Sequence, residues 1–213
     1  MREYQKIPGP FKRETEGPNR NKVIEGVFVS PEFEYLDDVA WIWTEKVDGT
    51  NVRVHWDSHK PRFGGRTDNA QMPTKLLDVL TETFTEELLE QVFGPTEVTL
   101  YGEGFGAGIQ SGGVYRPDIG FALFDVRIGD WWLKREDIVD IAEKLGIEVV
   151  PCLAVTTIES AVGMVQERRL KSKWGGGPIE GLVGVTQHGL LNRAGERIVV
   201  KIKAKDFPVE VDA

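Results

Sequence analysis

The order of strand-like and helix-like segments constrains the fold of this chain more than any other feature. Helical spacing of apolar residues predicts one long helix over residues 73–94 and two shorter helices over 134–146 and 159–170. Segments with the alternation or composition of strands cover residues 40–46, 51–57, 97–103, 119–129, 147–151, 180–186 and 196–203. Because strands outnumber helices and do not alternate with them regularly, we expect an α+β fold of mainly antiparallel sheets flanked by helices.

The chain has no internal repeat and no Pro- or Ser-rich stretch that would act as a linker. Its 213 residues are enough to build a substantial core. We therefore predict a single domain over residues 1–213, in which residues 1–21 form an irregular lead-in.

Bulk features exclude several classes of protein. The single cysteine, Cys152, excludes an intramolecular disulfide and a zinc site built on cysteines, and it suits a cytoplasmic location. No apolar run reaches the roughly 20 residues that a membrane span needs, and the N-terminus lacks the apolar core of a secretory signal. We expect a monomer that does not bind membranes, since no apolar stripe is evident.

Two motifs suggest sites that the surrounding residues do not support. The segment GEGFGA at residues 102–107 follows a strand, but a dinucleotide-binding fold needs a helix next, and the glycine-rich residues 108–117 do not favour one. His55 and His59 are four residues apart, but in a strand that ends near Pro61 this spacing does not bring them together on a metal.

One constellation of charged residues does indicate chemistry. Lys46 ends a predicted strand, just before the turn residues Asp-Gly-Thr, and Lys201 and Lys203 share a face of the last strand. Carboxylates stand at the ends of other predicted strands: Glu103, Asp125 and Glu180. Carboxylates that hold a divalent metal and lysines that neutralise phosphate charge suit phosphoryl transfer with Lys46 as the nucleophile.

At these residues the sequence resembles the covalent nucleotidyltransferase superfamily, and most closely its RNA ligase 2 family of nick-sealing enzymes. The motifs occur in the family's order. They are KVDGTN from Lys46, FGGRTDN with Arg66, LYGEGFGAGIQ around Glu103, FALFDV with Phe124 and Asp125, EGLV from Glu180, and KIK at Lys201–Lys203.

The resemblance implies an ATP-dependent reaction with Mg²⁺ or Mn²⁺ as the metal. Lys46 would attack the α-phosphate of ATP to form lysyl-AMP, AMP would pass to a 5′-phosphate end, and a 3′-hydroxyl would then seal the strand. Lys201 and Lys203 match the pair that holds the α-phosphate. Asp48, Asn51 and Glu180 match residues that orient the amine or bind the metal, with Glu180 and Asp48 binding it directly or through water.

The remaining matches concern the nucleotide. Glu45 corresponds to a contact with the adenine edge, Glu103 to a contact with the ribose hydroxyl and Phe124 to stacking on the base. Arg66 corresponds to a contact with the nucleotide or the 3′-end, and Asp125 belongs to the same nucleotide-binding set. Nucleic acid ends or nicks, with RNA preferred and a duplex as partner, are the implied substrates. A role in nucleic acid repair, with a phage-like origin, fits so compact a ligase.

The chain ends ten residues after Lys203, so we expect no C-terminal OB or helical domain. Alternative functions are a minimal ATP-dependent DNA ligase and a capping guanylyltransferase, which is less favoured because no OB-fold is expected after the core. A nucleotide-binding regulatory module without ligation is the alternative from a different class. Covalent labelling by ATP would indicate a ligase, labelling by GTP would indicate a capping enzyme, and no labelling by either nucleotide would indicate the binding module.

The distribution of charge removes an objection to a nucleic acid substrate. The chain has 26 Lys and Arg against 34 Asp and Glu, a net charge of −8. Residues 168–205, however, hold nine Lys and Arg and two Glu, so this basic stretch carries +7 and the rest of the chain −15. The basic stretch includes the last two motifs, and it predicts local, salt-sensitive binding of nucleic acid.

Overall fold

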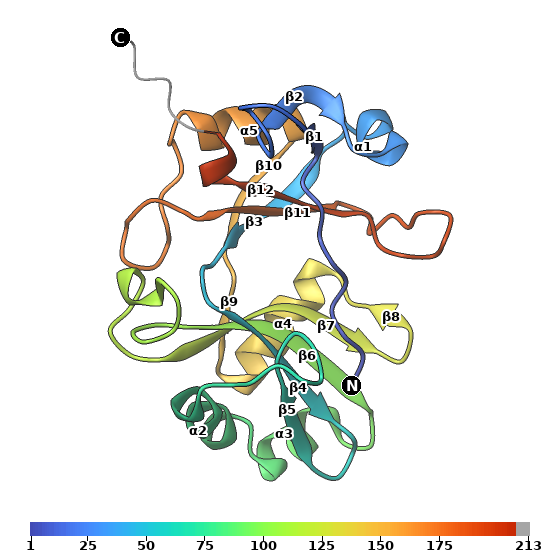
Figure 1. Ribbon diagram of the computed structural model, residues 1–213. Helices are drawn as coiled ribbons and strands as arrows, with labels where there is room; N and C mark the ends of the chain where they lie inside the picture. The colour runs from blue at the N-terminus through green and yellow to red at the C-terminus, as the bar shows by residue number, and fades with distance from the viewer. Residues whose placement is uncertain (208–213) are drawn as a thin grey trace. The chain divides into compact units, whose positions relative to one another are not determined.

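The computed structural model describes residues 1–207, and the chain divides into two compact units (Figure 1). The first unit consists of Met1–Gln5 and Val47–Val150, and the second of Lys6–Lys46 and the residues from Pro151 onward. Residues 208–213 of the predicted single domain lie outside the described part. That the whole chain acts as one nucleotidyltransferase domain stays a prediction.

The first unit is built on a sheet of six strands. Its strand order is β5-β4-β6-β7-β8, all antiparallel, and β9 pairs with β7 in parallel. Three α-helices pack with the sheet around one apolar core (Figure 1). The elements are β4 (Thr50–Trp56), β5 (Pro61–Gly64), α2 (Thr74–Thr83), α3 (Glu86–Phe93), β6 (Val98–Phe105), the 3₁₀ helix η1 (Gly112–Val114), β7 (Gly120–Ile128), β8 (Trp131–Trp132), α4 (Arg135–Leu145) and β9 (Glu148–Val149).

The second unit is built on an antiparallel sheet of four strands in the order β10-β3-β11-β12. A two-stranded sheet of β1 and β2 and the helix α5 contribute to the core on this sheet (Figure 1), where Trp41 and Trp43 are fully buried. The elements are β1 (Phe11–Arg13), β2 (Val23–Phe28), α1 (Pro31–Tyr35), β3 (Trp41–Lys46), β10 (Cys152–Thr156), α5 (Ile158–Gln166), β11 (Gly181–Thr186), β12 (Val199–Lys203) and the 3₁₀ helix η2 (Ala204–Asp206).

The predicted α+β class with mainly antiparallel sheets is confirmed. One local expectation is wrong. The long helix predicted over residues 73–94 is two helices, because Phe84 has a non-helical backbone and the Thr85 side chain caps α3 by accepting a hydrogen bond from the Leu88 amide. The residues after Lys46 lead from β3 into β4, which belongs to a different sheet.

The lead-in is more ordered than expected, because Phe11–Arg13 forms β1 and pairs with β2. None of the helices within residues 1–207 is long and apolar enough to cross a membrane.

Candidate active site

Lys46 is the last residue of β3, and its side chain is held by Glu180. The two strands are paired so that Lys46 lies opposite Gly181, which brings the preceding residue, Glu180, next to the lysine. Lys46 Nζ donates a hydrogen bond to Glu180 Oε2 at 2.6 Å, and both side chains are 23% exposed. The amine is therefore fixed by a carboxylate yet still accessible.

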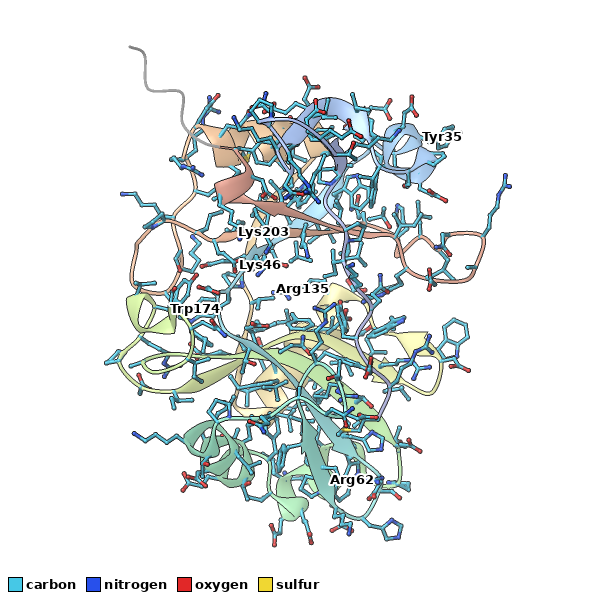
Figure 2. All side chains as sticks on the ribbon, viewed as in Figure 1. Tyr35, Lys46, Arg62, Arg135, Trp174 and Lys203 are labelled. Atoms are coloured by element: carbon cyan, nitrogen blue, oxygen red, sulfur yellow. The ribbon has the colours of Figure 1, made fainter. Side chains whose placement is uncertain are left out.

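Lys203 joins this pair from β12. Gly181 also lies opposite Lys203, on the other side of β11, and Lys203 Nζ is 3.9 Å from Glu180 Oε1. Figure 2 shows the Lys46 and Lys203 side chains next to each other. Lys201 and Lys203 are half-buried while Ile202 between them is buried, so the two lysines share the predicted face. Glu180 thus links two amines that come from different strands.

This arrangement requires a glycine at position 181, because the neighbouring strand leaves no room for a side chain there. A Cβ atom there would lie 2.0 Å from the carbonyl oxygen of Ile202, closer than real Cβ contacts allow. The Ala204 amide donates a 2.8 Å hydrogen bond to the Glu180 carbonyl, which fixes the backbone at the start of β11. Glycine at this position therefore keeps Glu180 close to β12.

Glu45 is a buried carboxylate beside Lys46 in sequence. Its Oε2 accepts a hydrogen bond from the Lys173 amide at 3.1 Å, whereas Oε1 is buried without a hydrogen bond of normal geometry to any part of residues 1–207. Burial raises the pKa of Glu45, although Ser172 and Lys173 act in the opposite direction. A buried acceptor that lacks a donor is expected where a ligand supplies one.

In the first unit, Asn51 on β4 lies directly opposite Glu103 on β6. The Asn51 Oδ1 atom is buried and has no hydrogen-bond partner among the described residues. The turn that leads to Asn51 is anchored where the Asp48 amide donates to the Tyr115 hydroxyl at 3.3 Å. At Gly49 a Cβ atom would lie 2.3 Å from the Gly104 carbonyl oxygen, so the turn packs closely on β6.

Phe124 and Asp125 lie at an irregularity of β7. Tyr101 pairs with Asp125 and Gly102 pairs with Leu123, so Phe124 is an extra residue without an opposite partner. Tyr4 packs edge-on against Phe124 at 5.1 Å between ring centroids and donates a 2.7 Å hydrogen bond to Asp125 Oδ2. The buried Asp125 thus holds the N-terminal segment, and its assignment to nucleotide binding stays a prediction.

Arg66 is exposed in the loop after β5. That loop is held in position by Arg53, a residue that was not among the predicted site residues. Arg53 is fully buried in β4 and donates hydrogen bonds to the Gly65 carbonyl at 2.6 Å, the Met1 carbonyl at 2.9 Å and Asp68 at 2.8 Å. Arg53 stands at a polar position in the alternation of Val52, Val54 and Trp56, so the sequence carries no signal that it is buried.

The predicted site residues therefore fall into two sets. The second unit brings together Lys46, Glu180 and Lys203, with Lys201 on the same strand face and Glu45 adjacent in sequence. The first unit pairs Asn51 with Glu103, with Asp48 on the turn, Arg66 on its loop, and Phe124 and Asp125 on β7. No group of three or more His, Cys, Asp or Glu side chains within residues 1–207 forms a metal cluster.

The sequence model of the RNA ligase family matches residues 39–203, more than three quarters of the chain. The chain belongs to the RNA ligase family. The resemblance expected from the motifs is therefore confirmed. All motif residues of this RNA ligase family member lie within the matched range. The comparison with curated proteins found no match.

Solved structures of Naegleria gruberi RNA ligase share the fold of this RNA ligase family member. A lysine-to-methionine mutant with AMP and Mn has a TM-score of 0.65 and 18% identity, and the match covers 82% of this chain and 52% of that one. A lysine-to-alanine mutant with ATP and Mn has a TM-score of 0.65 and 17% identity, and the match covers 83% of this chain and 54% of that one. The ligase with PPi has a TM-score of 0.64 and 18% identity, and the match covers 82% of this chain and 52% of that one. The chain thus spans about half the length of the Naegleria chains, and the nucleotidyltransferase fold is confirmed.

Proposed function

We propose that this protein is an ATP-dependent RNA ligase that works through a lysyl-AMP intermediate. The observation that carries the proposal is the amine of Lys46 held by Glu180 beside Lys203, in a chain of the RNA ligase family. The Naegleria ligase structures with ATP, AMP and Mn support the choice of nucleotide and metal.

In the first step, the neutral amine of Lys46 attacks the α-phosphorus of ATP. A nitrogen–phosphorus bond forms, the bond from the α-phosphorus to the bridging oxygen breaks, pyrophosphate leaves, and the amine loses a proton. Glu180 Oε2 already accepts a hydrogen bond from this amine, so it orients the nitrogen and is placed to accept the proton. Lys201 and Lys203 neutralise charge that develops on the α-phosphate.

In the second step, an oxygen of a 5′-phosphate attacks the same phosphorus and releases the Lys46 amine, which regains its proton. In the third step, a 3′-hydroxyl attacks the 5′-phosphate, loses its proton and displaces AMP, which seals the strand. Both steps are further displacements at phosphorus, and they need positioned cations more than new covalent chemistry. The lysines on β12 are therefore expected to serve all three steps.

The nucleotide contacts proposed from the resemblance agree with two buried acceptors that lack hydrogen-bond partners within residues 1–207. Glu45 Oε1 would accept from the exocyclic amine of adenine, and Asn51 Oδ1 is available for another donor. Glu103 would bind the ribose, Phe124 would stack on the base, and Arg66 would contact the nucleotide or the 3′-end.

The residues present fit a divalent metal that is shared with the substrate. Mg²⁺ is typically held by one or two carboxylates together with substrate phosphates, and Glu180 is such a carboxylate, half-buried between two lysines. Asp48 would contribute directly or through water. A bound Mg²⁺ or Mn²⁺ supplies neutralisation of phosphate charge.

Labelling with α-³²P-ATP and magnesium or manganese tests the proposal. We expect acid-stable label on the wild-type protein and a loss of at least about a thousandfold in Lys46→Ala, because the nucleophile is removed. Lys75→Ala, which removes an exposed lysine of α2, is the matched control and should label normally. Label from GTP alone would indicate a capping enzyme, and no label from either nucleotide would favour a binding module.

Sealing of pre-adenylylated nicks then separates the ligase alternatives. We expect nicks with RNA at the 3′-hydroxyl side to be sealed faster than all-DNA nicks. Equal rates would assign the protein to the DNA ligases instead. Action on duplexes, a monomeric state, a cytoplasmic location and a role in nucleic acid repair belong to the same proposal.

A further inference from the structure

A basic pocket in the second unit is lined by the two lysines of β12 and by further residues that the proposed function does not use. Its volume is about 380 Å³, and its walls come from the lead-in and from the end of the chain that the structure describes. The lining residues are Lys6, Ile7, Pro8, Gly9, Arg13, Lys201, Lys203, Lys205 and Asp206. Lys6, Arg13 and Lys205 lie outside the range matched by the family and outside every motif.

The pocket carries a concentrated positive charge. Among residues 1–207, five of the lining side chains are cations and one is a carboxylate, and Glu180 lies 3.9 Å from one of these cations, Lys203. Asp206 is paired with Arg13 at 2.5 Å, so the carboxylate compensates one cation directly. Like charges gathered in a small volume repel one another, and an anionic ligand would lower that repulsion.

The lead-in is held in place as one wall of this pocket. The Lys201 amide donates a 2.9 Å hydrogen bond to the Pro8 carbonyl, so the segment runs beside β12. Arg13 is fixed further along by its ion pair with Asp206 and by a 2.8 Å hydrogen bond to the Asn21 carbonyl. These contacts place Lys6 and Arg13 on the same pocket as the two lysines of β12.

Lys203 connects the pocket to Glu180 and, through it, to Lys46. Lys203 lines the pocket, and Lys203 is also the side chain that lies 3.9 Å from Glu180, the partner of Lys46. An anion in the pocket would therefore lie next to the lysine pair proposed to hold the α-phosphate.

We propose that this pocket binds the β- and γ-phosphates of the nucleoside triphosphate and the pyrophosphate that leaves. Several cations around one small volume suit a compact polyanion, whereas single-stranded nucleic acid is bound along a groove with aromatic side chains for stacking. Within residues 1–207, no aromatic side chain lines the pocket. The choice of pyrophosphate as the anion rests on the nucleotidyl transfer proposed above.

Calorimetric titration with inorganic pyrophosphate tests the pocket without any ligase activity. We expect wild-type protein to bind pyrophosphate, and Lys6→Ala and Lys205→Ala each to weaken binding by about tenfold, as for the loss of one charge-assisted contact. Both side chains are exposed, so the variants should keep the wild-type melting temperature. Lys12→Ala is the matched control, because Lys12 is an exposed neighbour of Arg13 that does not line the pocket, and it should bind pyrophosphate normally.

A second titration with 5′-phosphorylated and 5′-hydroxyl oligonucleotides identifies the source of the phosphate. Weaker oligonucleotide binding in Lys6→Ala and Lys205→Ala, with unchanged pyrophosphate binding, would overturn the proposal in favour of a strand-binding site. Unchanged binding of both ligands would overturn the pocket altogether, even if the protein ligates RNA. Pyrophosphate binding that depends on Lys6 and Lys205, in a protein that ATP does not label, would support the pocket while the proposed function fails.

Discussion

At the scale of single residues, Glu45 links the stability of the protein to pH. Its pKa is raised because burial disfavours the carboxylate. The stabilisation from protonated Glu45 is therefore fully present below the ordinary pKa of 4.5, and it is lost as the pH rises through the raised value. Above that value the fold bears the cost of a buried charge.

Glu45→Gln should remove this dependence, because glutamine is neutral at every pH and keeps an acceptor for the Lys173 amide. We expect the variant to gain stability relative to wild type as the pH rises from 4 to 8, measured by urea unfolding at each pH. Glu14→Gln, at an exposed position, serves as the control. A constant difference between Glu45→Gln and wild type across this range would contradict the assignment.

The residue scale also shows what the sequence could and could not predict of the site. The motif spacing predicted Lys46, Glu180, Lys201 and Lys203, and the pairing of β3, β11 and β12 shows how residues more than 130 positions apart meet. Arg53 escaped prediction because its partners are backbone carbonyls and Asp68 in a loop. Which carbonyls a buried arginine meets depends on tertiary structure.

At the scale of elements, the close pairing of β11 and β12 depends on Gly181. Gly181→Ala should lower the free energy of unfolding by about 1–3 kcal/mol, as overpacking does, and reduce labelling of Lys46 because Glu180 is displaced. Chemical denaturation and α-³²P-ATP labelling measure the two effects. The control is Gly163→Ala on α5, where a Cβ atom has open space, and it should be neutral or stabilising by about 0.5–1 kcal/mol. Equal stability of the two variants would contradict the claim that the pairing of β11 and β12 depends on Gly181.

Elements with strong periodicity were predictable, and short ones were not. The strands from Trp41, Val98, Gly120 and Gly181 agree with their apolar patterns, since each has at least one buried face. The helix α1 and the strand β1 have only five and three residues, too few for a period to be recognised. The break at Thr85 was missed because the apolar spacing continues through it, while the cap is a local hydrogen bond.

At the scale of the whole molecule, charge separation would allow this acidic protein to bind the nucleic acid that the proposed function requires. The basic stretch of residues 168–205 lies entirely in the second unit. Not all of it is available, because Arg168 donates hydrogen bonds to the carbonyls of Ala204 and Phe207. The other cations include Lys171 and Lys173, which are exposed.

Duplex RNA binding should therefore be strongly sensitive to salt. We expect the affinity to fall by about tenfold or more between 50 and 200 mM salt, since each neutralised phosphate contributes about 0.9 to the logarithmic slope. Lys171→Ala and Lys173→Ala should each reduce that slope, and Lys75→Ala should leave it unchanged. Fluorescence anisotropy over a salt series measures it, and a flat series would exclude this mode of binding.

The discontinuity of the second unit has a consequence for synthesis of the protein. Its sheet joins β3, which precedes most of the first unit in the chain, to β10, β11 and β12, which follow that unit. While the ribosome adds the intervening hundred or so residues, β3 has neither neighbour, and Lys46 lacks Glu180 and Lys203. The first unit is nearly continuous in sequence and can fold during that time. A nascent chain that ends before β11 would thus carry the proposed nucleophile without Glu180 and Lys203, and the proposed reaction with ATP would require a chain synthesised through β12.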